Sequence, residues 1–239
     1  MTFAVIVLLA LIAGIVQGVT GFGAGIVMMM GFPYFFSLPV SAALSGTIGT
    51  MLSVTMTWTY RKFINWKELV LPTIVYNAVS TLCIFVSTSL NAALMKKIFG
   101  VFLVILSIYY LFIAKDGDRQ KVSLPVGLLF CVISGACSAL FGVGGPLMVI
   151  YFLGKTHSTH EYLGTLQAFF LIQGIYNTII RIISGILTVE MLPSLGVGMV
   201  AIIIGGFVAR LVVKKLDGTM IRKITYVFIG ISGLLNIFG

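Results

Sequence analysis

Two glycine-rich stretches interrupt apolar sequence that would otherwise continue as helix. They read "GVTGFGAG" at residues 18–25 and "ALFGVGGP" at residues 139–146. Glycine is costly inside a helix, but it permits sharp turns and close backbone approach. Pro146 suits the first position of a helix because its missing N–H would be unpaired there anyway, and Gly25 is its counterpart. Two helix N-termini directed into the interior would offer free N–H groups and partial positive charge, so the pattern predicts an anion site.

Polar side chains gather around these breaks. Gln173, Asn177 and Arg181 are spaced i, i+4, i+8 and therefore share one helix face. Buried amides and charges are expensive in lipid, which favours a functional role for Gln17, Gln173, Asn177 and Arg181. Interhelical hydrogen bonding is the more ordinary role for serine and threonine. The predicted substrate-binding residues are Gln17, Thr20, Gly21, Phe22, Gly23, Gly25, Ser138, Gly142, Gly144, Gly145, Pro146, Gln173 and Asn177. Further polar candidates are Thr47, Thr50, Tyr76, Asn77 and Gln167.

Two arginines occupy matching positions and are predicted to act in gating or along the pathway. Arg61 ends "SVTMTWTYR" and Arg181 ends "QGIYNTIIR", so each follows a matched polar residue by eight positions. Each could attract an anion at its own mouth of a pathway. Arg61 also begins a basic pair and could simply anchor the topology, whereas Arg181 lies against the charge bias described below.

No catalytic or metal-binding group stands out, and the sequence is not expected to be an enzyme. The cysteines Cys83, Cys131 and Cys137 lie in apolar context without metal spacing. His157 and His160 flank a short polar loop, for which a solvated loop is favoured over a metal site. The expected spans contain no Asp or Glu, so a carboxylate proton relay is not predicted. No cofactor is expected, and a coupling ion, if used, would be H⁺ or Na⁺.

Composition places these residues in an all-α integral membrane protein. Of 239 residues, 59% are hydrophobic and 9% are charged, where a soluble domain would have about 25% charged residues. The first apolar run lacks a basic n-region and is interpreted as a membrane segment, with a cleaved signal peptide as the alternative. The expected segments are residues 2–18, 25–36, 40–60, 69–89, 95–114, 123–139, 146–153, 162–183, 191–213 and 220–238.

The two halves of the chain repeat each other. "IAGIVQGVTGFGAG" aligns with "ISGACSALFGVGGP" at a shift of 121, and the arginine-ending segments align at a shift of 120. At a shift of 126, "LMKKIFGVF" aligns with "MIRKITYVF". Three matches in one order predict a duplication. Residues 1–114 are the first repeat, 115–122 a polar linker and 123–239 the second repeat, all within one membrane domain.

Charge distribution predicts how the repeats are oriented. Residues 25–36 would extend only about 18 Å as helix, against about 30 Å of hydrocarbon, so each first pair of segments is a broken span or a helical hairpin. With hairpins, twelve of the 15 Lys and Arg residues share one face, and only Lys96, Lys97 and Arg181 face the other. This positive-inside signal favours hairpins, inverted repeats and two external termini. Charge counting does not decide whether the hairpins are re-entrant or fully spanning.

The duplicated motifs also carry a family resemblance. "GxxQGVTGFGAG" and "SGxxSALFGVGGP" in a chain of this length resemble the TauE/SafE sulfite-exporter family of membrane transporters, over nearly the whole chain. The resemblance implies transport of small sulfur-containing anions, such as sulfite or organosulfonates.

Together, motif and resemblance predict a multi-pass transporter in a prokaryotic plasma membrane, an exporter working by alternating access about a site between the breaks. The expected partners are a small anion and the lipid bilayer, not nucleic acid, and a homodimer is compatible with the sequence. The alternatives are an anion channel, a membrane-embedded enzyme and an assembly factor.

Overall fold

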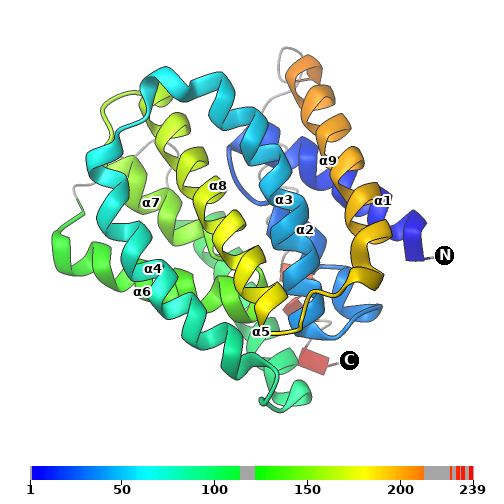
Figure 1. Cartoon of the computed structure of the whole chain (residues 1–239). Coiled ribbons are helices and arrows are strands. Elements are labelled where there is room, and N and C mark those ends of the chain that lie inside the picture. The colour runs from blue at the N-terminus through cyan, green and yellow to red at the C-terminus, as the bar shows by residue number, and fades with distance from the viewer. Residues whose placement is uncertain are drawn as a thin grey trace.

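The chain folds as a bundle of helices. The computed structural model describes residues 2–113 and 122–212 and single positions between 227 and 238. Within these ranges every regular element is helical, which confirms the predicted all-α class (Figure 1). The predicted linker (apart from Val122) and most of the last expected segment lie outside the described residues. The main helices are α1 Thr2–Thr20, α2 Ala24–Met29, α3 Leu38–Tyr60, α4 Trp66–Ser87, α5 Ala92–Ile108, α6 Leu124–Phe141, α7 Gly145–Lys155, α8 Thr159–Ile183 and α9 Leu192–Val212.

Six of the described helical segments are long and apolar enough to cross a membrane. They cover residues 3–20, 38–63, 66–87, 124–141, 159–183 and 189–211. Two further apolar segments, Ala24–Tyr34 and Gly145–Lys155, are too short to cross, as the sequence predicts for the second arm of each pair. The first of these is itself divided into α2 and a 3₁₀ turn at Phe32–Tyr34, because Gly31 and Pro33 interrupt the helix.

Polar caps start several helices earlier than hydropathy predicts. The Asn65 side chain accepts a hydrogen bond from the Glu68 N–H and begins α4, where the apolar run starts only at Leu69. Ser158 Oγ accepts from the Glu161 N–H at 3.1 Å and begins α8. Such caps satisfy N–H groups that have no partner within the helix. Apolar patterning does not detect the first turns of α4 and α8, because polar residues such as Glu68 and Glu161 lie in them.

Helices from the two halves of the chain pack on each other. The most extensive contacts join α1 with α9, α3 with α8 and α4 with α6, and each of these pairs takes one helix from each half (Figure 1). α3 and α8 lie side by side through the middle of the bundle. The two halves therefore pack against each other along their length, and residues near α3 and α8 are surrounded by helices from both halves.

Small residues allow the closest of these contacts. A Cβ at Gly14 of α1 would collide with the carbonyl oxygen of Ile202 in α9, and one at Gly205 would collide with that of Leu11. On the other side of the bundle, a Cβ at Gly135 of α6 would lie 2.8 Å from the Tyr76 carbonyl oxygen of α4. Glycine lets helix backbones approach closely where no hydrophobic effect drives them together in lipid.

We expect Gly205→Ala to lower the melting temperature of the purified protein in detergent, because the added methyl group forces α1 and α9 apart. Overpacking of this kind costs about 1–3 kcal/mol. The matched control is Gly196→Ala in the same helix, where a Cβ would meet nothing within 4 Å. That control should melt at or slightly above the wild-type temperature, since alanine favours helix. Equal melting of the two variants would contradict the packing described for α1 and α9.

Candidate functional site

Both glycine motifs are breaks between two helices. α1 ends at Thr20, and α2 begins after Gly23, whose φ of 101° lies in the left-handed region. α6 is closed by Gly142 at φ 66°. Only glycine adopts these conformations without strain. Each of the two helix ends has an equivalent capping bond. The Gly21 N–H donates to the Gln17 carbonyl at 2.7 Å, and the Gly142 N–H donates to the Ser138 carbonyl at 3.0 Å.

The two breaks meet inside the bundle. A Cβ at Gly25 would collide with the carbonyl oxygen of Gly142, and a Cβ at Gly142 would lie 2.6 Å from Ser45 Oγ. Segments more than a hundred residues apart are therefore in backbone contact, with α3 against both. This contact requires residues without side chains.

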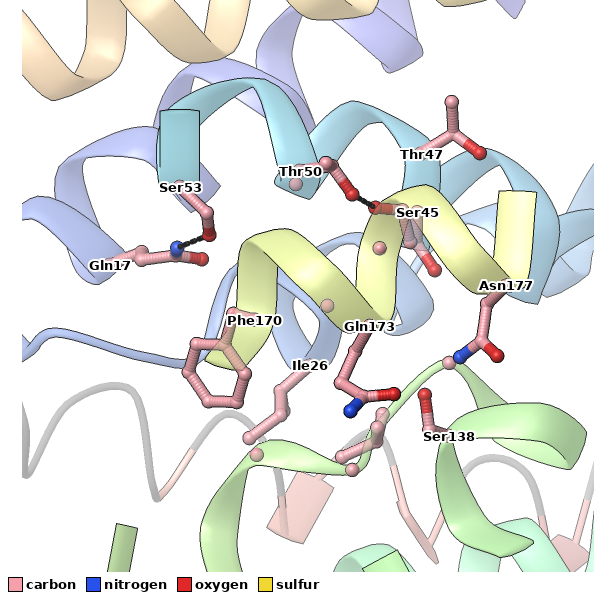
Figure 2. A pocket seen from close by; sticks show the side chains of 18 of the residues that line it. Gln17, Ile26, Ser45, Thr47, Thr50, Ser53, Ser138, Phe170, Gln173 and Asn177 are labelled. Carbon is pink, nitrogen blue, oxygen red and sulfur yellow. Dashed lines mark hydrogen bonds between the residues drawn. The ribbon is translucent and has the colours of Figure 1, made fainter. Parts of the chain in front are cut away.

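A cavity of about 110 Å³ lies beside the meeting point (Figure 2). It has room for several water molecules, each of which takes about 30 Å³ in the liquid, or for one anion with a few heavy atoms. Both breaks, α3 and α8 form its walls. The predicted residues that line it are Gln17, Gly23, Gly25, Thr47, Thr50, Tyr76, Ser138, Gly142, Gly144, Gly145, Pro146, Gln173, Asn177 and Arg181.

Three predicted residues lie at the first break but outside the cavity lining. The Thr20 hydroxyl bonds to the carbonyl oxygens of Val16 and Phe22 and holds the turn. The Gly21 carbonyl accepts from Gln167 Nε2 at 2.5 Å, and Phe22 packs in the apolar core. The structure thus gives these residues contacts that shape the break.

The cavity lining also contains residues beyond the predicted ones, and several of them lie on α3 beside Thr47 and Thr50. The added lining residues are Ile26, Ser45, Gly46, Gly49, Ser53, Val143, Phe170, Gly174 and Thr178. Gly46 and Gly49 stand on α3 near Ser45 and Ser53, so this face of α3 is lined by small side chains. The run of glycine, serine and threonine between residues 45 and 53 is the signal that could have identified it, because small residues mark close approach in membranes.

Several buried polar side chains of the described structure lack a hydrogen-bond partner, and among those that line the cavity this holds for Gln173. Only 3% of its surface is exposed, and neither Oε1 nor Nε2 has a hydrogen-bond partner in the described structure. Figure 2 shows its amide directed from α8 toward the loop between α6 and α7. An unpaired buried amide costs about 1–3 kcal/mol, so an unsatisfied pair of polar atoms at a cavity wall indicates a binding position.

The amide of Gln17 is engaged on the other side of the cavity. Its Nε2 donates to Ser53 Oγ at 3.3 Å and to Gln167 Oε1 at 3.4 Å, and Gln167 in turn donates to the Gly21 carbonyl. This chain of contacts links α1, α3 and α8. Asn177 is partly engaged as well, since its Oδ1 accepts from Ser80 Oγ at 2.9 Å.

Arg181 lies deeper than the mouth position that the sequence predicts. It is 3% exposed, and its guanidinium donates to the carbonyl oxygens of Ala42, Ser138 at 2.9 Å and Ala139 at 3.1 Å. Ser138 and Ala139 are in the last turn of α6, where carbonyl groups have few N–H partners within the helix; the Ser138 carbonyl also accepts the capping bond from Gly142. Among the described residues no carboxylate forms an ion pair with Arg181. Its buried charge is therefore balanced only by carbonyl dipoles, which draw it to the end of α6.

Arg61 is not part of this cavity. Its side chain is exposed, lies over the Trp58 ring at 4.4 Å and donates to the Trp58 carbonyl oxygen. The two matched arginines thus have different environments: one is folded into the protein, and the other stays on its surface.

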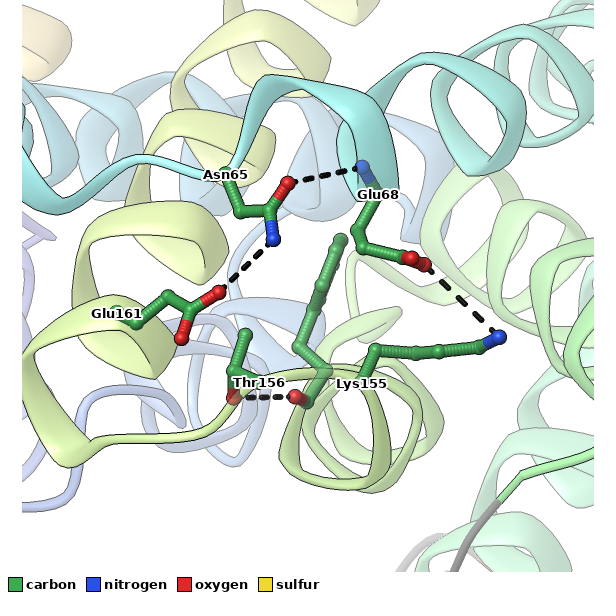
Figure 3. Close-up of polar contacts among 6 residues, drawn as sticks. Asn65, Glu68, Lys155, Thr156 and Glu161 are labelled. Carbon is green, nitrogen blue, oxygen red and sulfur yellow. Dashed lines mark hydrogen bonds and ion pairs between the residues drawn. The ribbon is translucent and has the colours of Figure 1, made fainter.

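The end of the molecule near Arg61 is closed by polar contacts (Figure 3). Asn65 Nδ2 donates to Glu161 Oε1 at 2.8 Å, and the Asn65 N–H donates to Thr165 Oγ1 at 2.9 Å. Lys155 Nζ lies 3.9 Å from Glu68 Oε2. These contacts join the start of α4 to the α7–α8 connection.

The nearby loop histidines show no metal arrangement. The His160 ring contacts Phe63, and within the described residues no group of His, Cys, Asp or Glu could hold a metal ion.

The opposite end contains a hollow of about 640 Å³. Lys96, Leu140, Ser184 and Glu190 are among its wall residues. Leu140 directly follows the carbonyls held by Arg181, and Ser184 lies one turn beyond Arg181 in α8. Arg181 therefore stands between the central cavity and this hollow.

The fold and this site define a class: a multi-pass helical membrane protein with a polar central cavity between two broken helix pairs. The model of the sulfite exporter TauE/SafE family matches residues 6–235. The chain belongs to this family of membrane transporters, which confirms the resemblance found in its glycine motifs.

One curated relative adds to this. A probable membrane transporter protein of Methanocaldococcus jannaschii is 28% identical over 158 residues, which cover 61% of this chain and 59% of that protein. The match thus spans less than two thirds of the relative's length. No solved structure matches the chain.

We expect Gly142→Ala to destabilise the protein more than Gly185→Ala. Both glycines have positive φ, 66° and 72°, so alanine adds backbone strain of about 1–2 kcal/mol at each. Only at Gly142 would the new methyl group also meet α3, since nothing lies within 4 Å of a Cβ at Gly185. Melting temperatures in detergent test this, and equal losses would show that the breaks are not in tight contact.

Proposed function

We propose that this transporter exports a small sulfur-containing oxyanion, such as sulfite or an organosulfonate, and binds it in the central cavity against Gln173. The observation that carries the proposal is the buried Gln173 amide, which has no partner in the described protein and lines a cavity of the right size. The family's description as sulfite exporters supports both the substrate class and the direction.

Two sources of positive potential favour an anion there. α7 begins at the cavity and, at 11 residues, is long enough to present a helix N-terminus. The short α2 has only 6 residues, so we assign this role to α7 alone. Arg181 lies two turns of helix beyond Gln173, about 12 Å at 1.5 Å per residue. Both residues line the same cavity, so the positive charge of Arg181 attracts a monoanion bound there.

We infer that the two halves are inverted repeats and that they move against each other in alternating access. Three observations support this: the pairing of α1 with α9 and of α6 with α4, the shared capping bonds at both breaks, and the placement of the short arms α2 and α7. In transporters with this arrangement, broken helices form the site and rocking of one repeat opens each side in turn.

In this scheme the structure is the state open toward the hollow beside Arg181 and closed at the Asn65–Glu161 end. Arg181 then holds the α6 carbonyls at the open side. In the opposite state, we propose, Arg61 leaves Trp58 and takes the equivalent place at the Gln17 carbonyl, while Arg181 is released. The Gln17 carbonyl already accepts the matching cap bond from the Gly21 N–H.

We expect sulfite to raise the melting temperature of the purified wild-type protein more than acetate does. Sulfate, sulfoacetate and taurine complete the panel. Gln173→Ala should weaken the sulfite effect about tenfold or more in apparent affinity, because the anion loses its hydrogen-bond donor. Ile175→Ala, at a 51% exposed position two residues away, is the control and should bind as wild type. The proposal fails if no anion in the panel stabilises the protein.

The arginine exchange predicts that the two arginine variants differ. Arg181→Gln should weaken anion stabilisation and abolish flux into liposomes, because the cavity loses its positive charge. Arg61→Gln should bind the anion normally in detergent but transport it at least about tenfold more slowly, since the opposite state loses its cap. Lys62→Gln, a neighbouring exposed cation, is the control. Wild-type flux in a correctly inserted Arg61→Gln protein would refute the exchange.

A further inference from the structure

We propose that the transported species is a singly charged oxyanion that also carries a hydrogen-bond donor, that is, a partly protonated oxyanion such as hydrogen sulfite and not the fully deprotonated dianion. This inference rests on the proposed function and specifies the ligand of the same cavity.

The first argument is the chemistry of Gln173. A carboxamide always presents both an acceptor oxygen and a donor NH₂ group, whichever way it is turned. Both atoms are buried and without partners in the described structure. An oxyanion without a hydrogen can satisfy only the NH₂ group and would leave a buried carbonyl oxygen facing negative charge. A ligand with an O–H group beside its anionic oxygens satisfies both atoms.

The second argument is that several side-chain donors of the cavity are already used within the protein. Gln17 Nε2 is engaged by Ser53 and Gln167, and the hydroxyls of Ser45 and Thr50 donate to the carbonyls of Ala42 and Gly46. The cavity thus includes acceptor positions as well as donors. A dianion needs a surplus of donors, whereas a protonated monoanion matches a mixed lining.

The third argument is charge. One arginine lies near the cavity, and the described carboxylates of Glu68, Glu161 and Glu190 lie at the first turns of helices or in a 3₁₀ turn at the ends of the bundle. No described acidic side chain lines the cavity, so none there could carry a proton with the substrate. A proton bound to the oxyanion itself needs no relay, and it lowers the ligand charge to the single unit that Arg181 balances.

The test compares two ligands of the same shape and charge. Methanesulfonate has no donor, while methylphosphonate, at a mildly acidic pH where it is a monoanion, has the same methyl group and one P–OH donor. Binding is measured by thermal stabilisation of the full-length wild-type protein in detergent, together with sulfite. We expect methylphosphonate monoanion to bind about tenfold more tightly than methanesulfonate, the effect of one unsatisfied buried group. The stabilisation by methylphosphonate and by sulfite should fall as pH rises and the ligand loses its proton, while that by methanesulfonate stays constant.

The variant Gln173→Leu identifies the residue. It should remove the difference between the two ligands and flatten the pH profile of sulfite. Equal binding of the pair to wild type, or a preference that survives in Gln173→Leu, overturns the inference while leaving anion transport in place. If sulfite binds but neither methanesulfonate nor methylphosphonate does, the pH dependence of sulfite stabilisation is the deciding measurement. The same pH dependence in wild type and in Gln173→Leu then overturns the inference. If sulfite and every other anion fail to stabilise the protein, the proposed function itself is wrong.

Discussion

Backbone polar groups inside a membrane protein need partners from the protein or from a water-filled cavity, and both helix breaks of this chain lie inside the bundle, where such partners are few. Each break frees carbonyl groups at the end of one helix and N–H groups at the start of the next. Side chains from α8 satisfy some of these carbonyl groups. Gln167 donates to the Gly21 carbonyl at the first break, and Arg181 donates to the Ser138 and Ala139 carbonyls at the second.

Because side chains of α8 contact both breaks, the two halves of the chain differ in structure although their motifs match in sequence. At the shift of 120, the long polar side chains of Gln167, Gln173 and Asn177 correspond to Thr47, Ser53 and Thr57 of α3. α3 therefore presents a face of short side chains, which both breaks can approach closely, as the contact between Gly142 and Ser45 requires. α8 presents side chains long enough to cross the remaining space. The cavity is the volume that those side chains leave unfilled.

The contacts at the two ends of the bundle have different strengths. At the closed end the Asn65–Glu161 hydrogen bond and the capping bonds of α4 and α8 are formed, but the Lys155–Glu68 ion pair is partly exposed and contributes little. At the other end one buried cation separates a hollow from the cavity. Polar contacts of this kind are suited to opening, because water can replace the hydrogen bonds that are lost.

Several features could be predicted from the sequence because they depend on local or averaged properties. Apolar length determines which segments can cross a membrane, and glycine with proline determines where they break. The short arms α2 and α7 follow from these rules, as does the polar stripe of Gln173, Asn177 and Arg181, since helical spacing alone places them on one face. The predicted starts of α4 and α8 are three residues late, because their first turns contain charged residues and are fixed by the preceding caps Asn65 and Ser158.

Only the tertiary structure decided which polar groups are already satisfied. The sequence treats Gln17 and Gln173 as equivalent buried amides, yet Ser53 and Gln167 engage the first and nothing in the described protein engages the second. Likewise Arg61 and Arg181 match in sequence, but Arg61 donates to Trp58 in its own helix, whereas Arg181 donates to carbonyls of α6, because α6 ends beside it. The hydrogen-bond partners come from other helices, 36 to 150 residues away in the chain, so no local pattern can assign them.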